Sequence, residues 1–383
     1  MTATDRDRPS TDDPPRRVAV VGHGALSTQR VDGQTLRTRL VIDELRRRLG
    51  EDRVQVVDTG SLPTRGIRTV LDLLTARATC GDLVVMPNTR GLRVLLPLYA
   101  RWARRGRPRV HYLVVGGWLP RVVNRRPRSV NALQELQGIY VQSNRMVREL
   151  EGAGLRNVAL LPNFRRFPHE RERSRACGDP FRFVFLSRIM PEKGVEHAIE
   201  AVQRLNVHKG AQVATLDLWG PLTTGAQVWF ERVMQGAGAA IRYRGVLAPE
   251  TVVTQLPSYD MMLFPTYYSG EAFPGVIIDA MVSGIPVIAS DWQDNPEFVE
   301  HGKNGLLFKT RDVDELTRYV LWSYEHPEEV MRMKHDSAKR ADAFHVDVVM
   351  PELLTSLDLT VGEATGSRNG DPTVHDDDRP RVR

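Results

Sequence analysis

The stretch from residue 269 to residue 291 combines residue types that could hold a sugar joined to a diphosphate. Pro274 has the fixed φ angle that suits a first helical turn, and Gly275 lets a ligand approach the backbone closely. A helix is expected over 276–283. The free N–H groups at its start, together with the helix dipole, form a site that attracts anions without a metal.

Two carboxylates accompany this predicted helix. Glu271 stands just upstream of it, where it could accept hydrogen bonds from sugar hydroxyl groups. Asp279 lies one turn inside the helix, where it could reach ribose hydroxyl groups. An ordinary loop and helix with acidic residues would show the same pattern, so this stretch alone leaves both interpretations open.

A second motif carries two basic residues. Arg188 follows a short apolar run, and Lys193 comes five positions later, directly before a glycine. A turn of this length can aim both side chains at one pocket. There, the planar guanidinium group and the compact ammonium group would together neutralise a diphosphate leaving group. The alternative is a basic loop that faces solvent.

Parallel strands and helices are expected to position these motifs. Short β-branched runs alternate with helical patterns along the chain, which is typical of parallel sheets covered by helices on both faces. The sequence predicts two doubly wound α/β domains. The expected strands cover 18–21, 54–57, 83–86, 110–115, 139–141 and 158–161 in the first half, and 181–186, 213–219, 241–243, 261–264, 286–289 and 306–308 in the second.

The chain is long enough for two cores, with 383 residues of which 41% are hydrophobic. It contains two cysteines, Cys80 and Cys177, without metal-ligand or CxxC spacing, which indicates a reducing compartment. No signal peptide or bilayer-length apolar run is recognisable, so a cytoplasmic protein is expected. We expect a disordered tail at 1–16, an acceptor-binding Rossmann-like domain at 17–165, a linker at 166–179, a nucleotide-sugar-binding Rossmann-like domain at 180–345, a helix at 346–358 that can pack back on the first domain, and a disordered tail at 359–383.

Charge divides the chain into two unequal parts. Residues 1–174 contain 32 arginines, no lysine and 17 acidic residues, a net charge of +15. The remainder contains 21 basic and 30 acidic residues, a net charge of −9. A basic first half could meet nucleic acid, anionic lipid headgroups or a diphosphate-bearing acceptor. We expect no nucleic acid partner, because the arginines fall in helical patterns and are not interleaved with aromatic residues.

The motifs occur in the order found in a known family. The chain resembles the retaining glycosyltransferases of family four, the group 1 glycosyltransferases, whose GT-B architecture has two Rossmann-like domains that face each other across a cleft. The resemblance covers about residues 17–358. The matching residues are Ser187-Arg188, Glu192-Lys193-Gly194, Phe264-Pro265-Thr266, Gly270-Glu271-Ala272-Phe273-Pro274-Gly275, Asp279-Ala280-Met281, Gly284-Ile285-Pro286-Val287 and His301-Gly302-Lys303-Asn304-Gly305, and in the first half Gly22-His23-Gly24, Gly33-Gln34-Thr35-Leu36-Arg37-Thr38 and Gly116-Gly117-Trp118.

The resemblance implies roles for individual residues. Arg188 and Lys193 would hold the donor diphosphate, and Glu271 would contact the donor sugar. Asp279 would bind the ribose, at a position where the family usually has Glu, which is longer by about 1.5 Å. The residues expected in catalysis are Glu271, Arg188, Lys193 and His23, and those expected to bind the donor are Gly24, Gly220, Val246, Phe273, Pro274, Gly275, Val276 and Asp279.

The function expected from this resemblance is transfer of a hexose from a nucleoside diphosphate sugar, with UDP-sugar favoured, to a hydroxyl group of a glycan or lipid-linked glycan. The configuration would be retained, and no metal or other cofactor would be needed. We expect a role in surface polysaccharide or glycoconjugate assembly, with contact to an anionic membrane at its inner face. The alternatives are a nucleotide-sugar or nucleic-acid binding protein without catalysis, or an epimerase or phosphorylase on the same scaffold. Asp58, after the second expected strand, also leaves nicotinamide binding open.

Overall fold

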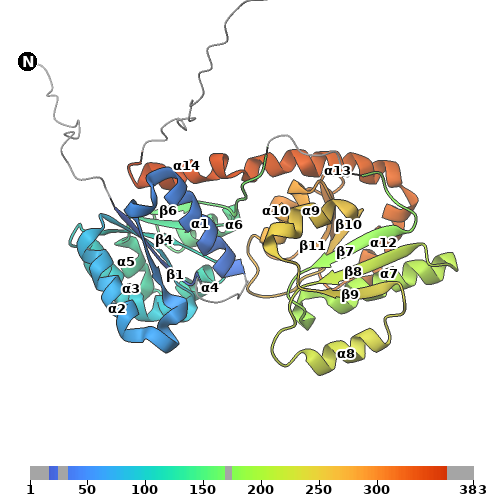
Figure 1. The fold of residues 1–383 in the computed structure, drawn as a ribbon, viewed down its shortest axis with the longest axis horizontal. Coiled ribbons are helices and arrows are strands. Elements are labelled where there is room, and N and C mark those ends of the chain that lie inside the picture. Colours follow the sequence, from blue (N-terminus) through green and yellow to red (C-terminus); the bar gives the residue numbers. More distant parts are fainter. Residues whose placement is uncertain (1–16, 25–32, 169–174, 360–383) are drawn as a thin grey trace, which may run out of the picture.

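The computed structural model describes residues 17–24, 33–168 and 175–359 and consists of two α/β domains side by side (Figure 1). Each domain contains one six-stranded parallel sheet. This confirms the predicted fold class. Each strand lies within two residues of its predicted bounds, because buried parallel strands read as short, nearly continuous apolar runs.

The first sheet has the order β2-β1-β3-β4-β5-β6. All its pairs are parallel, so the carboxyl ends of the strands meet at one edge. The strands are β1 (Val18–Gly22), β2 (Val54–Asp58), β3 (Asp82–Met86), β4 (Arg109–Leu113), β5 (Gly138–Val141) and β6 (Val158–Leu160).

Helices cover both faces of the first sheet. One core cluster packs α2 (Leu62–Thr79), α3 (Thr89–Ala103), α4 (Leu119–Arg125), α5 (Arg128–Gln134) and α6 (Asn144–Gly152) against one face. A second cluster packs α1 (Gly33–Leu49) and α14 (Val346–Ser356) against the other. The last helix of the described chain therefore belongs to the core of the first domain.

The second sheet has the order β12-β11-β10-β7-β8-β9, again with parallel pairs throughout. Its strands are β7 (Phe181–Leu186), β8 (Ala214–Trp219), β9 (Ile241–Gly245), β10 (Met261–Phe264), β11 (Val287–Ser290) and β12 (Gly305–Phe308). Its helices are α7 (Val195–Lys209), α8 (Gln227–Gln235), α9 (Val252–Gln255), α10 (Gly275–Val282), α11 (Asn295–Phe298), α12 (Val313–Glu325) and α13 (Pro327–Ala341).

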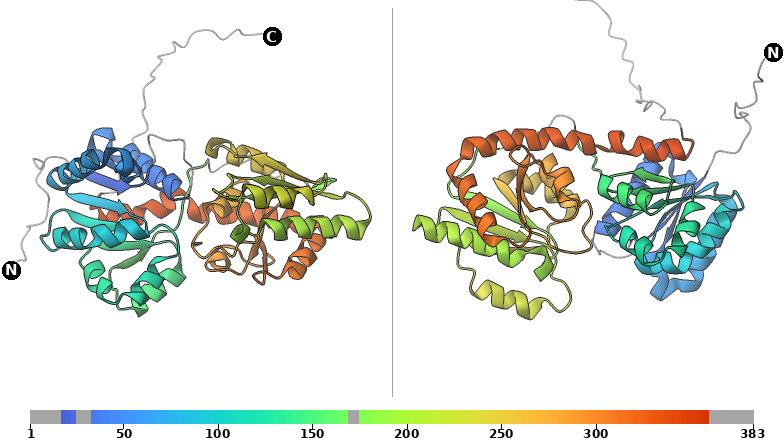
Figure 2. Two further views of the ribbon diagram at one scale, coloured as in Figure 1. Left: turned by 90° about the horizontal axis from the view of Figure 1, so that it is seen from below. Right: turned by 180° about the vertical axis from the view of Figure 1, so that it is seen from behind.

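The chain passes between the domains twice, and the two passages meet. The backbone N–H of Arg165 donates to the Phe344 carbonyl at 3.0 Å, and the N–H of Val346 donates to the Arg165 carbonyl at 2.9 Å. From there α14 runs back along the first domain, as the views from the front and from behind show (Figure 1, Figure 2). Among the helices of the described residues, none has both the length and the apolar character needed to cross a bilayer.

Candidate active site

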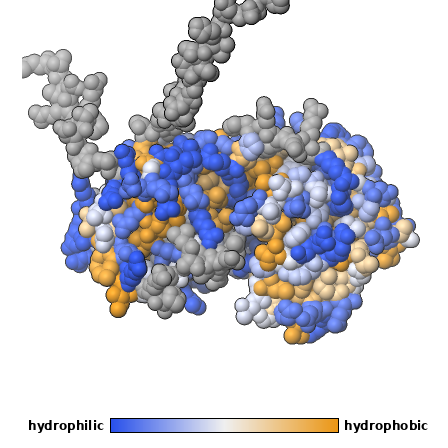
Figure 3. All heavy atoms as spheres, in the orientation of Figure 1, coloured by the Kyte–Doolittle hydropathy of each residue, from blue (hydrophilic) through white to orange (hydrophobic). Residues whose placement is uncertain are grey.

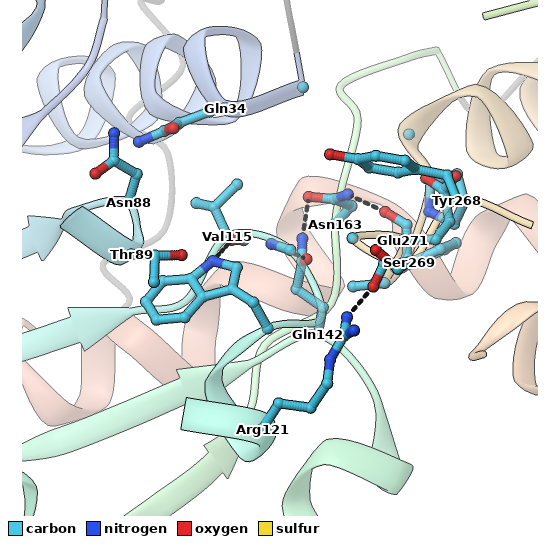
Figure 4. Close-up of a pocket in the computed structure, with 18 of the residues that line it drawn as sticks. Gln34, Asn88, Thr89, Val115, Arg121, Gln142, Asn163, Tyr268, Ser269 and Glu271 are labelled. Atoms are coloured by element: carbon cyan, nitrogen blue, oxygen red, sulfur yellow. Dashed lines mark hydrogen bonds between the residues drawn. The ribbon is translucent and has the colours of Figure 1, made fainter. Parts of the chain in front are cut away.

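A cleft of about 900 Å³ lies between the two domains, at the carboxyl ends of both sheets. Ligands bind at this edge in open α/β sheets. Figure 4 shows Gln34, Asn88 and Thr89 of the first domain on one side, and Tyr268 and Glu271 of the second domain on the other. The lining also includes Val115, Gly116, Trp118, Arg121, Gln142, Asn163, Ser187, Arg188, Lys193 and Phe273 to Val276.

Lys193 and Glu271 form an ion pair in this cleft. Nζ of Lys193 lies 2.5 Å from Oε2 of Glu271, and both residues are buried. The hydroxyl group of Thr266 also donates to Oε2, at 3.0 Å. A buried charge that has both an ionic partner and a further hydrogen bond is held in one place. The sugar-binding and phosphate-binding residues expected from the sequence therefore contact each other directly.

The backbone around Lys193 requires a glycine. Gly194 has a φ angle of 76°, and a Cβ atom there would lie 2.1 Å from the carbonyl oxygen of Pro265. A side chain would force the Lys193 turn away from the loop that follows β10. Gly194 thus brings the two motifs within reach of each other.

Arg188 reaches the same place from the end of β7. Its guanidinium carbon lies 5.1 Å from the ring centroid of Tyr268, and Nζ of Lys193 also lies 5.1 Å from that centroid. Two cations on one aromatic ring concentrate positive charge on the second-domain side of the cleft. An anionic group that enters the cleft would find both of them.

The start of α10 supplies further polar groups. Pro274 occupies the N-cap position, and Gly275 and Val276 begin the helix and line the cleft, with first-turn N–H groups that have no partner inside the helix. The ring of Phe273 faces the other way and stacks on Phe298, with centroids 3.5 Å apart. Phe273 therefore contributes its backbone to the cleft and its side chain to the core.

Asp279 has a partner that no pattern in the sequence predicts. Its two carboxylate oxygens accept hydrogen bonds from Nε and Nη2 of Arg165, at 2.6 and 3.0 Å. Asp279 is buried and is not among the residues that line the cleft. A ribose contact would require Asp279 to share or exchange this arginine.

The first-domain residues His23 and Gly24 lie outside the described lining of the cleft. The ring of His23 packs against Gly60, where a Cβ atom would lie 3.1 Å from Cε1 of the histidine. The N–H of Gly24 donates to Asp58 Oδ1 at 3.1 Å, and the N–H of Gly60 donates to the same oxygen at 2.9 Å. Asp58 thus joins two backbone segments near the end of β2.

Gly220 and Val246 also stand apart from the cleft lining. A Cβ atom at Gly220 would lie 1.7 Å from the carbonyl oxygen of Ser187, so this glycine lets the end of β8 pack beneath the turn that carries Arg188. Val246 follows β9, and 61% of its surface is exposed. Gly220 thus helps to position the turn that carries Arg188.

Asn163 joins the two domains beside the cleft, and no motif in the sequence pointed to it or to Gln142. Asn163 accepts from Gln142 at 2.9 Å and from Arg37 at 2.7 Å, and it donates to the Phe273 carbonyl at 2.5 Å (Figure 4). Burial, and secondarily the nearby charge of Arg165, lowers the pKa of Arg37 to about 9. No short-range pattern marks Asn163, because Arg37 lies 126 positions away, Gln142 lies 21 positions away and Phe273 belongs to the other domain.

The loops after β4 and β10 touch directly. A Cβ atom at Gly117 would lie 2.2 Å from the Glu271 carbonyl oxygen, so only a glycine allows this approach. Arg121 at the start of α4 donates to the Ser269 carbonyl (Figure 4). Gly116-Gly117-Trp118, one of the first-half motifs that match the family, thus sets how closely the first domain approaches Glu271.

Residues 180–326 match the family model described as glycosyl transferases group 1. This part of the chain runs from β7 to α12 and carries Arg188, Lys193, Glu271 and Asp279. The second domain belongs to the group 1 glycosyltransferases. The family predicted from the sequence is therefore confirmed.

Curated relatives match this chain over part of their length. The MMP alpha-(1->4)-mannosyltransferase of Mycolicibacterium hassiacum is 30% identical over 158 residues, which are 40% of this chain and 36% of that protein. The glycogen synthase of Mycobacterium tuberculosis is 27% identical over 239 residues, which are 58% of this chain and 55% of that protein. The chain thus spans 36% and 55% of the length of these two relatives.

Solved structures match the chain over most of its length. HepE (Alr3699) of Anabaena in complex with UDP superposes with a TM-score of 0.66 at 17% identity, over 89% of this chain and 99% of that one. Sucrose-phosphate synthase of Thermosynechococcus elongatus superposes with a TM-score of 0.67 at 14% identity, over 90% of this chain and 99% of that one. These likenesses establish the GT-B architecture predicted from the sequence.

Proposed function

We propose that this protein transfers a hexose, with retention of configuration, from a nucleoside diphosphate sugar to a hydroxyl group of a glycan or lipid-linked glycan. The observation that carries the proposal is the joint position of Arg188, Lys193 and Glu271 beside the first turn of α10, in a cleft that both domains line. Cations, helical N–H groups and one carboxylate are the groups that a sugar diphosphate requires.

The donor would lie with its diphosphate against Arg188, Lys193 and the N–H groups of Gly275 and Val276. Glu271 would accept hydrogen bonds from sugar hydroxyl groups, while its pairing with Lys193 keeps sugar and diphosphate in a fixed relation. In the transfer, the bond between the anomeric carbon and the phosphate oxygen breaks and a bond from that carbon to the acceptor oxygen forms. The acceptor proton goes to the departing phosphate oxygen, on the same face of the sugar. Preorganised cations stabilise the charge that develops on the leaving group, so the proposal requires no metal.

UDP is the favoured donor nucleotide. Support comes from the Anabaena HepE structures in complex with UDP and with UDP-glucose, which share the fold of this chain. A role in surface polysaccharide or glycoconjugate assembly fits relatives such as the amylovoran biosynthesis glycosyltransferase AmsK of Erwinia amylovora, 27% identical over 150 residues.

A contact with an anionic membrane also belongs to this proposal. Ile67, Val70, Leu71 and Leu74 form an apolar stripe on α2, with exposed fractions of 83%, 52%, 58% and 49%. Figure 3 shows hydrophobic side chains at the surface of the first domain where α2 lies. The neighbouring helix α3 adds exposed arginines, and the two helices touch where Arg77 lies over Trp102. An apolar stripe beside arginines fits an anionic lipid surface.

The first test is calorimetric binding of UDP, GDP and ADP in the presence of a chelator. We expect UDP to bind to the wild-type protein and to bind more weakly to Arg188→Ala. Product analysis with UDP-hexose should then show sugar transfer to an acceptor hydroxyl group with the donor configuration kept. Binding of none of the three nucleotides, or release of an epimerised sugar nucleotide without transfer, would refute the proposed function.

A further inference from the structure

A second cavity adjoins the cleft on the first domain. It has a volume of about 740 Å³ and lies between α3, α4 and α5. Its floor is apolar, with Leu92, Leu96 and Leu133 buried beneath it and Val122 and Ala132 partly exposed along it. We call this cavity the α3–α5 groove. A floor of this composition binds hydrocarbon, because apolar surface is removed from water when a chain covers it.

Arginines surround this apolar floor. Arg93, Arg125 and Arg126 line the α3–α5 groove and also line the cleft, so they mark the junction of the two cavities. All three are exposed, and no carboxylate of the described residues lies within 4.0 Å of their guanidinium groups. Arg104, 3.9 Å from Glu135 Oε1, and Arg128 border the groove elsewhere, and none of the described residues that line the groove is acidic. Arg93, Arg125 and Arg126 beside an apolar floor favour a ligand that has an anion at one end and a hydrocarbon chain at the other.

The order of the groups along the two cavities sets the orientation of that ligand. Hydrocarbon would lie in the groove, an anion at the arginine junction, and the part beyond the anion in the cleft beside Glu271. Phosphate suits the junction, because guanidinium groups bind phosphate oxygens through paired hydrogen bonds. A free sugar, a glycan chain or a nucleic acid is polar and would leave the apolar floor of the groove uncovered.

We infer that the α3–α5 groove holds the hydrocarbon chain of a lipid phosphate, whose phosphate or diphosphate binds Arg93, Arg125 and Arg126 and whose sugar presents its hydroxyl group in the cleft. This rests on the proposed function and names its acceptor as a glycan linked to lipid through phosphate. No bond changes in the groove itself, since the reacting hydroxyl group lies in the cleft.

Farnesyl phosphate is the probe, used with the full-length protein in buffer that contains a chelator and no detergent, below the concentration at which the probe forms micelles. Calorimetry should show that it binds, that farnesol binds at least about tenfold more weakly, and that inorganic phosphate alone binds weakest. The double variant Arg93→Ala/Arg126→Ala should lose about tenfold or more in affinity for farnesyl phosphate. Ala132→Glu, which places a carboxylate on the apolar floor, should lose at least as much.

Arg101→Ala/Arg105→Ala is the matched control. It removes the same charge from the end of α3, at exposed residues that do not line the groove, and should bind farnesyl phosphate as the wild type does. Equal binding of farnesol and farnesyl phosphate would overturn the inference, and so would equal losses in the control and the groove variants.

UDP titrated into the same samples separates this inference from the proposed function. If UDP binds and farnesyl phosphate does not, the groove assignment is wrong and the donor site stands. If farnesyl phosphate binds in the groove and no nucleotide binds, the transferase proposal fails while the groove assignment for a lipid phosphate holds. Ala132→Glu should leave UDP affinity unchanged, which also shows that the variant is folded.

Discussion

Arg165 holds both carboxylate oxygens of Asp279, from Nε at 2.6 Å and from Nη2 at 3.0 Å. Arg165 belongs to the segment through which the chain leaves the first domain, and Asp279 belongs to α10, whose first turn lines the cleft. The same guanidinium group lies over the start of α10, where a Cβ atom at Gly275 would be 2.4 Å from Nη2. The passage between the domains is thereby tied to the helix expected to bind phosphate.

Asp279→Asn should therefore act on stability more than on nucleotide binding. It leaves the charge of Arg165 mostly buried without its anion, which costs roughly 3 kcal/mol. We expect a lower urea midpoint and a UDP affinity close to that of the wild type. If the variant instead lost affinity for UDP but not for 2′-deoxy-UDP, a ribose contact by Asp279 would be the better explanation.

A double-mutant cycle should reveal the coupling between Lys193 and Glu271. Either single change, Lys193→Met or Glu271→Gln, leaves one buried charge without its ionic partner, whereas the double variant removes both charges. We expect a coupling free energy of about 1 to 3 kcal/mol in urea unfolding. Strict additivity of the two single changes would show that the pair contributes nothing as a unit.

Arg188→Ala should lower turnover by about a hundredfold, comparable to the loss of one preorganised electrostatic donor. Arg311→Ala is a matched control, because Arg311 also lies over a tyrosine ring but does not line the cleft. Its guanidinium carbon is 4.3 Å from the ring centroid of Tyr267, the residue before Tyr268. Initial rates of hexose transfer measure both variants. Equal turnover of the two variants would show that Arg188 takes no part in catalysis.

Gly117→Ala should separate the loops after β4 and β10, since its new methyl group would overlap the Glu271 carbonyl. Displacing reacting groups by about 1 Å can lower a rate by about a hundredfold, so we expect a loss of that order in transfer rate. Small-angle scattering should show a larger radius of gyration. Gly152→Ala is the control, because nothing lies within 4 Å of a Cβ atom there, and it should change neither quantity.

Glu44 should make stability depend on pH in the acid range. Burial opposes its ionisation, but hydrogen bonds from Arg47, Arg48 and Arg166 outweigh burial and lower the pKa of Glu44 to about 2. A lowered pKa in the folded state stabilises the fold above the ordinary value of 4.5, and this stabilisation is lost as pH falls towards 2.

Glu44→Gln should thus cost about 2 kcal/mol at pH 7 and progressively less below pH 4.5. Urea unfolding at pH 7 and at pH 2.5 measures the difference. Asp43→Asn, at the exposed neighbouring position, should change stability little at pH 7. A cost for Glu44→Gln that stays constant across this range would contradict the assignment.

The sequence was sufficient for the elements and for the second-domain motifs. Apolar runs marked the strands, and the five-position spacing of Arg188 and Lys193 predicted that both face one pocket. The family resemblance added Glu271, which the structure places beside Lys193. Apolar runs and short motifs lie within short stretches of chain, so they can be recognised without knowing how the domains contact each other.

Contacts between the domains could not be read in this way. Arg165 lies in a segment expected to be part of a domain border. The residues next to it in the sequence do not predict its contact with Asp279, 114 positions away. Asn163 and Gln142 are polar residues after strands, of which the chain has many. Sequence periodicity also could not show that the apolar stripe of α2 is exposed, because a stripe with this spacing would ordinarily be assigned to a core.

The place of α14 has a consequence for synthesis of the protein. Val346, Val349, Met350, Leu353, Leu354 and Leu357 cover one face of the first sheet, against Val18, Val20 and Val84. When the ribosome has made the first six strands, α1 already covers part of that face, but the part that α14 covers stays open until the whole second domain has emerged. The domain that is translated first is therefore the last to be completed, and the exposed valines of β1 and β3 are the surface that a chaperone would have to shield in the meantime.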